Sequence, residues 1–247
     1  PDVQVKSVLS NPDQDPHLFD VSPSVARAIA GAEIVVYNGA GYDPWAQRLV
    51  AAAPKAGRDV IVVADLLHRA AGDNPHLWYS PETMPALAKA MAVTLARRDP
   101  AHRADYDRRL KAFEVSMTDL QGRITEIRGK YAGAPITATE PVFGYMAEAL
   151  GLTMRNERFQ LSVMNDTEPS AADVAAIETD LKQKRVKVLL YNSQTTGPMT
   201  ERLKGIARAA GVAVVGVSET EPAGKSYQQW MRGQLDLLEK ALNGAGS

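Results

Sequence analysis

Short apolar runs rich in β-branched residues alternate along this chain with alanine-rich stretches in which apolar residues recur at helical spacing. The apolar runs predict strands over residues 3–9, 34–38, 60–64, 136–139, 186–191 and 212–217. The stretches between them predict helices over residues 24–30, 44–53, 81–96, 171–184 and 199–210. Strand followed by helix in repetition predicts an α/β fold, with parallel sheets flanked by helices.

One segment, from about residue 101 to 131, breaks this alternation. Its apolar positions follow steps of four and three, so they form one stripe along a single long helix. The residues of this stripe are Tyr106, Leu110, Phe113, Met117, Leu120, Ile124 and Ile127. We interpret the helix, at 100–131, as a rigid strut that joins an N-terminal lobe at 1–99 to a C-terminal lobe at 132–247. The alternative is a coiled-coil dimer seam, which would use the same pattern.

Composition narrows the classes of protein that fit. The 247 residues carry 28 Lys and Arg against 29 Asp and Glu, and this balance argues against a nucleic-acid-binding protein. The absence of cysteine excludes disulfide scaffolds, cysteine-ligated zinc and thiol nucleophiles. No apolar run approaches the roughly 20 residues that span a bilayer. The chain opens at Pro1 without a methionine, so we expect a processed or truncated sequence.

Two histidines share one local pattern, in Asp15-Pro16-His17-Leu18-Phe19 and in Asn74-Pro75-His76-Leu77-Trp78. In parallel α/β sheets, ligands bind beyond the carboxyl ends of the strands, and both segments follow predicted strands. The proline restrains the backbone, and the Leu and aromatic residues that follow can be buried, which would hold each imidazole in place. His17 and His76 are therefore candidate metal ligands. Ordinary loop histidines are the alternative.

Two glutamates also follow predicted strands, in the C-terminal lobe. Glu140 comes directly after the strand that ends at Thr139, and Glu219 follows the strand that ends near Val217. Two neutral imidazoles and two carboxylates together match the charge of a divalent first-row metal ion. A strand-end glutamate can equally be a helix cap or a solvated charge, and Glu221 could take the place of Glu219.

These segments resemble the motifs of the metal-binding receptors of zinc and manganese ABC importers, the TroA-like or cluster A-I solute-binding proteins. The resemblance runs over essentially the whole chain, with the motifs in the same order. Beyond the two histidine motifs with Ser22-Pro23 and Ser80-Pro81, it includes residues 38–45, 139–145, 218–220, 226–227 and 230–231. It implies two α/β lobes joined by one long backbone helix. It also implies one metal ion bound between the lobes by His17, His76, Glu140 and Glu219.

The sequence departs from the family pattern at several places. The fourth ligand is usually aspartate, whereas Glu219 is one methylene longer. Zinc receptors often have histidine at the third position, where this chain has Glu140, and they frequently carry a His-rich loop, of which only His68 is present. The first strand and helix of the family would precede Pro1, so we expect the N-terminal lobe to lack them.

The resemblance implies an extracytoplasmic solute-binding protein that captures Mn²⁺ or Zn²⁺ and delivers it to the membrane permease of an ABC importer. The oxygen-rich ligand set favours manganese in relative terms, and both carboxylates could chelate it through two oxygens. The Irving–Williams order nevertheless gives zinc the tighter absolute binding. We expect a monomer without a nucleic-acid partner, free in the periplasm or lipid-anchored.

The alternative function is a mononuclear metal-dependent hydrolase. A catalytic zinc ion normally keeps one coordination position open for water, whereas four candidate ligands converge in this chain. The sequence contains no HExxH, Gly-x-Ser-x-Gly or phosphate-loop motif. We therefore expect a binding protein and not an enzyme.

Overall fold

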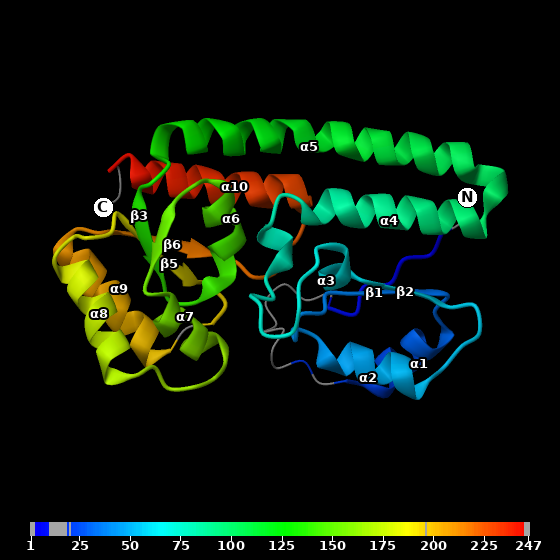
Figure 1. Cartoon of the computed structure of the whole chain (residues 1–247), viewed down its shortest axis with the longest axis horizontal. Helices are drawn as coiled ribbons and strands as arrows, with labels where there is room; N and C mark the ends of the chain where they lie inside the picture. Colours follow the sequence, from blue (N-terminus) through cyan, green and yellow to red (C-terminus); the bar gives the residue numbers. More distant parts are fainter. Residues whose placement is uncertain (1–2, 10–18, 20, 196, 245–247) are drawn as a thin grey trace. The chain divides into compact units, whose positions relative to one another are not determined.

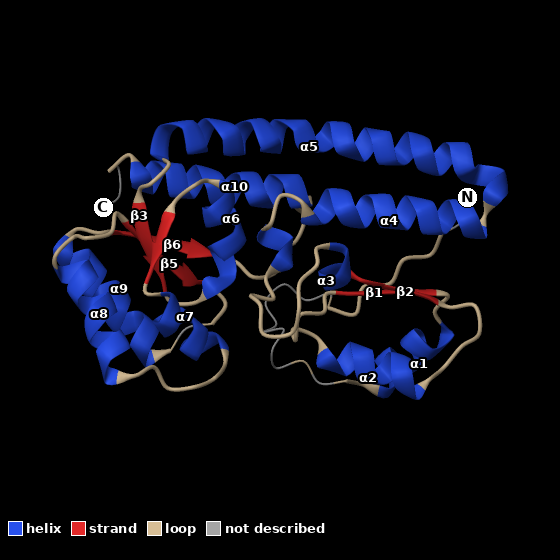
Figure 2. Cartoon of the chain, viewed as in Figure 1, coloured by secondary structure: helices blue, strands red, loops and turns tan. Residues whose placement is uncertain are grey.

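The computed structural model describes residues 3–9, 19, 21–195 and 197–244 (Figure 1). The chain divides into two compact units, Pro1–Met117 and Thr118–Ser247. Each unit has its own parallel sheet with helices around it (Figure 2). The predicted α/β fold is confirmed.

The first unit is built on two parallel strands, β1 (Ile34–Tyr37) and β2 (Asp59–Val62). Its helices are α1 (Pro23–Gly31), α2 (Pro44–Ala52), α3 (Val63–Leu66) and α4 (Thr83–Arg98), with 3-10 turns η2 (Leu77–Tyr79) and η3 (Pro100–His102). Ser22 begins α1 as the Ser-Pro pattern predicts, because its side chain accepts a hydrogen bond from the backbone N–H of Val25 at 3.3 Å.

The strand predicted over residues 3–9 is wrong. These residues form no regular structure, and the side chain of Val5 is 89% exposed. A β-branched run becomes a strand only where a neighbour takes its backbone hydrogen bonds. Among the described residues of this unit, β1 and β2 pair only with each other. The helix predicted over residues 81–96 is present as α4, but it begins at Thr83. Ser80, just before the predicted start, ends η2 instead.

The second unit holds a four-stranded parallel sheet in the order β4-β3-β5-β6. The strands are β3 (Pro135–Ala138), β4 (Thr153–Arg155), β5 (Val188–Asn192) and β6 (Ala213–Val217). The helices are η4 (Pro141–Phe143), α6 (Gly144–Ala149), α7 (Glu157–Met164), α8 (Ala171–Lys182), α9 (Pro198–Ala210) and α10 (Tyr227–Leu242). The sequence analysis missed the short edge strand β4 and the helices α6, α7 and α10.

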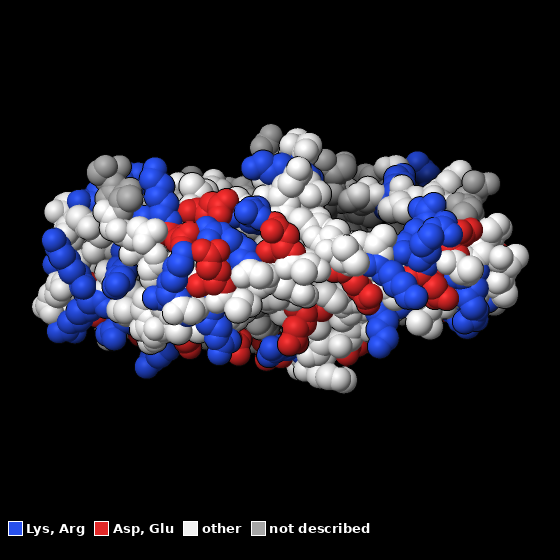
Figure 3. Space-filling view, turned by 90° about the horizontal axis from the view of Figure 1, so that it is seen from above, with Lys and Arg blue, Asp and Glu red and all other residues white. Residues whose placement is uncertain are grey.

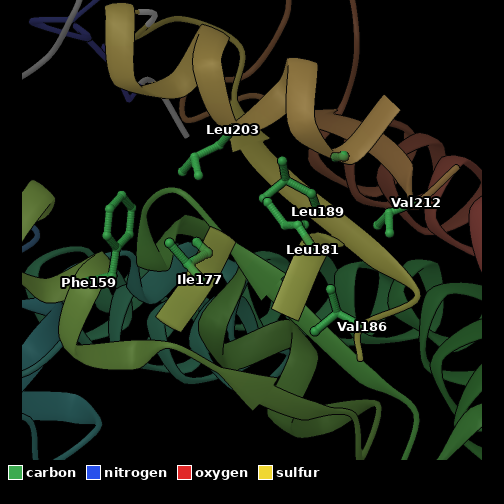
Figure 4. Packing of buried hydrophobic residues seen from close by; sticks show 8 residues of the cluster. Phe159, Ile177, Leu181, Val186, Leu189, Leu203 and Val212 are labelled. Carbon is green, nitrogen blue, oxygen red and sulfur yellow. The ribbon is translucent and has the colours of Figure 1, made fainter. Parts of the chain in front are cut away.

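One core cluster of this unit lies between the sheet and helices α7 to α9 (Figure 4). Its buried members are Phe159, Ile177, Leu181, Val186, Leu189, Leu203, Ala207 and Val212. Leu189 projects from the middle of β5 into this core, so its neighbours Val188 and Leu190 face the other side of the sheet. Helix α10 packs there against β5 and β6. Both faces of β5 are therefore buried, which is why this strand reads as a continuous apolar run.

The long helix predicted near residues 101–131 is present as α5 (Arg103–Tyr131), and the boundary between the two units falls within it, after Met117. Tyr106, Met117, Leu120, Ile124 and Ile127 of its apolar stripe are buried, and the other two stripe residues are half-buried. The chain itself covers the stripe, so these residues do not form the exposed seam that a coiled-coil dimer would need. No helix in the described ranges has both the length and the hydropathy needed to cross a bilayer.

Ion pairs join the second half of α5 to α10. The guanidinium of Arg123 pairs with Glu239 and, at 3.0 Å, with Asp236, and the ammonium of Lys130 pairs with Glu239 at 3.1 Å. Both cations also pair with Glu126 on α5 itself. Acidic and basic side chains are interspersed over the face that carries α5 (Figure 3). These ion pairs hold the second half of α5 against α10, in addition to the burial of the apolar stripe.

Arg123→Met is expected to lower the melting temperature at pH 7 by a few degrees at most. The fall in melting temperature between pH 7 and pH 3 should also be smaller in the variant than in the natural protein. Arg123 and then Lys130 hold the pKa of Glu239 below its ordinary value of 4.5. Because the pKa is lower in the folded state, the stabilisation is present above pH 4.5 and is lost as the pH falls through the folded-state pKa. Thermal melts at pH 7 and pH 3 test this. An equal loss in Arg109→Met, an exposed arginine on the same helix, would contradict it.

Candidate metal centre

His76 lies in the loop of the first unit that leads into η2, and its side chain is only 1% exposed. Oδ1 of Asn74 accepts a hydrogen bond from the backbone N–H of His76 at 3.1 Å and lies 2.7 Å from the ring Nδ1. Because an amide oxygen only accepts, the neutral ring carries its proton on Nδ1. The imidazole lone pair is then on Nε2, in the arrangement typical of a metal-ligating histidine with an oriented second nitrogen.

Aromatic rings and the loop after β1 hold His76 in place. Its ring lies edge-on to Tyr42 and Trp78, with ring centroids 6.3 and 5.4 Å away. Nδ2 of Asn38 donates a hydrogen bond to the carbonyl oxygen of Pro75 at 2.8 Å, which joins the two loops directly beside the histidine. Residues 38–45, one of the segments on which the family resemblance rests, therefore support His76.

This supporting loop depends on Gly39. Its φ angle is +78°, and a Cβ at this position would lie 2.6 Å from Cγ1 of Val62 and 2.9 Å from Cβ of Ala64, so only glycine fits. The carboxylate of Asp43 accepts hydrogen bonds from the backbone N–H groups of Asn38 at 2.7 Å and Gly39 at 2.8 Å. Burial raises the pKa of Asp43, and the bonds from Gly39 and Asn38 oppose that rise.

The second unit brings both candidate glutamates together. Glu140 follows β3, Glu219 lies just beyond β6, and Asn192 is the last residue of β5, which runs between those two strands (Figure 1). Nδ2 of Asn192 donates hydrogen bonds to Oε2 of Glu219 at 2.8 Å and to Oε2 of Glu140 at 3.2 Å. All three side chains are buried. The carboxyl edge of the sheet therefore carries a buried pair of acids on one shared amide.

The loop after β5 orients this group. The backbone N–H of Gln194 donates to Oδ1 of Asn192 at 3.0 Å, which turns the NH₂ end of the amide toward the glutamates. The side-chain oxygen of Gln194 accepts from the backbone N–H groups of Glu219 at 2.6 Å and Thr220 at 2.9 Å. One short loop thus positions both the shared amide and the backbone that carries Glu219.

The charge on this group suits a cation. The Oε2 atoms of Glu140 and Glu219 lie within about 6 Å of each other, because both are bonded to the same nitrogen at 3.2 and 2.8 Å. Two ionised carboxylates at that separation repel each other, and a neutral amide does not cancel their charge. A divalent cation between them would.

The four predicted ligands differ in what the structure says of them. Glu140 and Glu219 are together in the second unit, His76 belongs to the first unit, and His17 lies outside the described residues. Within the described residues, no three His, Asp or Glu side chains are grouped as a metal site requires. Glu221, the alternative to Glu219, is exposed, so the geometry favours Glu219. The complete ligand set stays a prediction.

The sequence analysis missed Asn192 and Gln194. The predicted strand over residues 186–191 stops one residue short of Asn192, and the candidate ligands were acids and imidazoles, which do not include an amide. A signal was available: Asn192 is a polar residue directly after an apolar run, the same kind of position that singled out Glu140.

Comparisons with known proteins agree with the family resemblance and the fold. The curated relatives include the manganese ABC transporter substrate-binding lipoprotein PsaA of Streptococcus mitis, 24% identical over 93% of this chain and 79% of the relative. They also include the high-affinity zinc uptake system protein ZnuA of Bacillus subtilis, 24% identical over 93% of this chain and 76% of the relative.

Solved structures show the same fold. The solute-binding protein FpvC of Pseudomonas aeruginosa in complex with Mn²⁺ has a TM-score of 0.76 at 23% identity, over 96% of this chain and 90% of the other. The periplasmic zinc-binding protein TroA of Treponema pallidum has a TM-score of 0.76 at 17% identity, over 92% and 87%. A family profile described as "Zinc-uptake complex component A periplasmic" matches residues 1–241. The predicted resemblance is confirmed, and the chain belongs to this ZnuA family of metal-binding solute receptors.

Proposed function

We propose that this protein captures one divalent transition-metal ion, Mn²⁺ or Zn²⁺, and delivers it to the membrane permease of an ABC importer. The observation that carries the proposal is the buried pair of Glu140 and Glu219 on one amide at the carboxyl edge of a parallel sheet. Two buried acids this close cost free energy unless something positive binds with them. In a chain of this family, a metal ion as cargo meets that requirement.

The proposed ligands are His17 and His76 of the first unit with Glu140 and Glu219 of the second. In terms of the predicted lobes, two ligands come from 1–99 and two from 132–247, and the helix at 100–131 joins them. Imidazole nitrogens and carboxylate oxygens bind both Mn²⁺ and Zn²⁺. The resemblance to receptors named for each of these ions supports the choice of cargo.

Four protein ligands leave no ready position for a catalytic water, so we propose a receptor without hydrolytic activity. The comparisons lend the hydrolase alternative no support. The family is described as periplasmic, which supports a location outside the cytoplasm. Some relatives are named as lipoproteins, which supports attachment to the membrane through a lipid anchor as an alternative to a free periplasmic protein. We propose that the receptor acts as a monomer that docks on its permease and binds no nucleic acid.

The proposal is tested by metal analysis and competition. Protein purified without added metal is expected to contain up to one zinc or manganese ion per chain. After removal with a chelator, adding either ion at about 100 times its Kd should stabilise the fold by about 2.7 kcal/mol, read as a rise in melting temperature. Mg²⁺ and Ca²⁺ at the same concentrations serve as controls. Absence of both a bound ion and a thermal shift would rule out the function.

Asn74→Ala is expected to weaken metal binding by about 10- to 100-fold, as is typical when the group that orients a ligating histidine is removed. The variant loses the acceptor that holds the proton on Nδ1 of His76. Competition with a chromophoric chelator measures the change. Asn74→Asp, which keeps an acceptor oxygen at this position, is the matched control and should bind at least as tightly as the natural protein. Unchanged affinity in Asn74→Ala would mean that Asn74 does not orient a ligand.

A further inference from the structure

Exposed basic side chains collect at the amino edge of the sheet in the second unit. The helices that cover a parallel sheet run opposite to its strands, so the carboxyl ends of the helices and the first residues of the strands meet at this edge. Five of the exposed basic residues there have no ion pair within the described ranges. We name this group the basic edge, and its members are Arg128, Lys184, Lys187, Arg208 and Lys240.

Contacts within the unit spread the basic edge over the starts of the strands. A Cβ on Gly211, which lies just before β6, would be 3.7 Å from Nζ of Lys184. Lys187 directly precedes β5, and its backbone N–H donates to the carbonyl oxygen of Pro135, the first residue of β3, at 2.8 Å. The guanidinium of Arg128 donates to the carbonyl oxygen of the last residue of α6, which leads into β4, at 3.3 Å. The positive charges therefore extend along the whole edge.

The acids near the basic edge do not cancel its charge. The buried carboxylate of Asp180 pairs with Arg155 and Arg185, and Glu239 belongs to the ion pairs between α5 and α10. Glu148, at the end of α6, is an exposed acid at this edge and offsets one of the five cations. Lys and Arg are more prominent than Asp and Glu at the end of this unit on the left of Figure 3. Because the whole chain has a net charge of −1, this surplus is local.

Helix stabilisation accounts for only part of the basic edge. A cation in the last turn of a helix interacts favourably with the helix dipole, and Arg128, Arg208 and Lys240 occupy such turns. Lys184 and Lys187 lie beyond the end of α8, whose last turn already contains Lys182. These two lysines are exposed and have no such role in the fold.

An anionic lipid surface fits the basic edge better than a folded protein does. The centre of a protein interface is usually apolar, whereas no large apolar side chain is exposed in residues 182–187 or at the strand starts of the described unit. Clusters of Lys and Arg are attracted to anionic lipid headgroups, and each cation adds to the binding independently of any pocket. The periplasmic description of the family puts a bilayer within reach.

We propose that the basic edge docks on an anionic phospholipid surface. Glu140 and Glu219 lie at the opposite ends of the same strands, so docking leaves these acids open to ions in solution. Strands of five residues separate the two edges by about 17 Å. This distance exceeds the Debye length of about 8 Å at physiological ionic strength, so the lipid charge is screened from the acids. The inference goes beyond the proposed function and does not depend on which ion is bound.

The test is co-sedimentation of the full chain with vesicles of equal parts phosphatidylglycerol and phosphatidylcholine. The natural protein is expected to bind at low salt and to dissociate at high salt. Lys184→Gln combined with Lys187→Gln should weaken binding by about tenfold or more, the effect of two cations near a charged surface. Both residues are exposed, so the melting temperature and the metal affinity should stay the same.

The matched control removes two positive charges from the carboxyl edge. Arg158, near the start of α7, is 85% exposed at its side chain, and Lys225 is exposed in the loop after β6. Arg158→Gln combined with Lys225→Gln changes the net charge by the same amount as the first double variant. This control should bind the vesicles as tightly as the natural protein, because its substitutions lie away from the basic edge.

Several results would overturn the inference. These are no binding to the anionic vesicles at low salt, equal binding to vesicles of phosphatidylcholine alone, and equal losses in the two double variants. Release by soluble glycerol phosphate at matched ionic strength would indicate a site for a single phosphate group. Binding to polyglutamate without binding to vesicles would indicate an acidic protein partner. Metal affinity is measured separately, so none of these results bears on the proposed function.

Discussion

Replacing Glu219 with alanine is expected to weaken binding of Zn²⁺ and Mn²⁺ by more than about 100-fold, since removal of a ligand should cost more than removal of a residue that orients one. The metal-free fold should be unharmed. Glu219 and Glu140 share one neutral amide, so deleting one acid relieves their repulsion and leaves the other acid its bond to Asn192. Chelator competition measures the affinity, and thermal melting without metal measures the fold.

The control for this experiment is Glu221→Ala. Glu221 is exposed and only two residues away, and it was the alternative ligand in the sequence analysis. The Glu221→Ala variant should bind metal with the same affinity as the natural protein. Glu140→Ala and His76→Ala should behave like Glu219→Ala. If Glu221→Ala lost binding while Glu219→Ala kept it, the fourth ligand would have to be reassigned, and natural affinity in Glu140→Ala or His76→Ala would remove those residues from the site.

Phe159→Ala is expected to destabilise the second unit by about 3–5 kcal/mol, the usual cost of deleting a fully buried aromatic side chain. Phe159 lies on α7 and is a buried member of the core in Figure 4, with Ile177 and Leu181 of α8 in the same cluster. Its loss leaves a cavity that the neighbouring helices can fill only in part. Denaturant unfolding of the metal-free protein measures the change in the free energy of unfolding.

Leu161→Ala is the matched control for Phe159→Ala. It deletes a large apolar side chain from the same helix, at a position that is 41% exposed. We expect a loss below about 1 kcal/mol, because little area returns to water and no cavity forms. Equal losses in the two variants would mean that α7 does not pack on the core as described.

The elements that the sequence predicted well are those whose pattern is local. The stripe on α5 repeats over many turns, so its helix could be read with little regard to the rest of the chain. The central strands β3 and β5 are mostly buried, and their apolar runs, like that of the edge strand β6, predict them directly. Both glutamates at the ends of β3 and β6 followed from the same reading.

The failures concern elements whose state depends on partners elsewhere in the chain. Residues 3–9 have the composition of a strand but pair with none of the described strands, so they stay irregular. The short strand β4 has little pattern of its own and exists because β3 supplies its hydrogen bonds. In both cases the local composition sets only a preference for or against a strand. Hydrogen bonding to a neighbouring strand decides whether a strand forms.

The sequence by itself determined the alternation of strands and helices, the long connecting helix and the acids that end two strands, because each of these is a property of neighbouring residues. Only the tertiary structure decided that Glu140 and Glu219 meet on Asn192, which lies 52 and 27 residues away from them. The order β3-β5-β6 places those three strand ends side by side. Sheet order is a long-range packing result that no local pattern encodes, and through it a single amide comes to orient two acids.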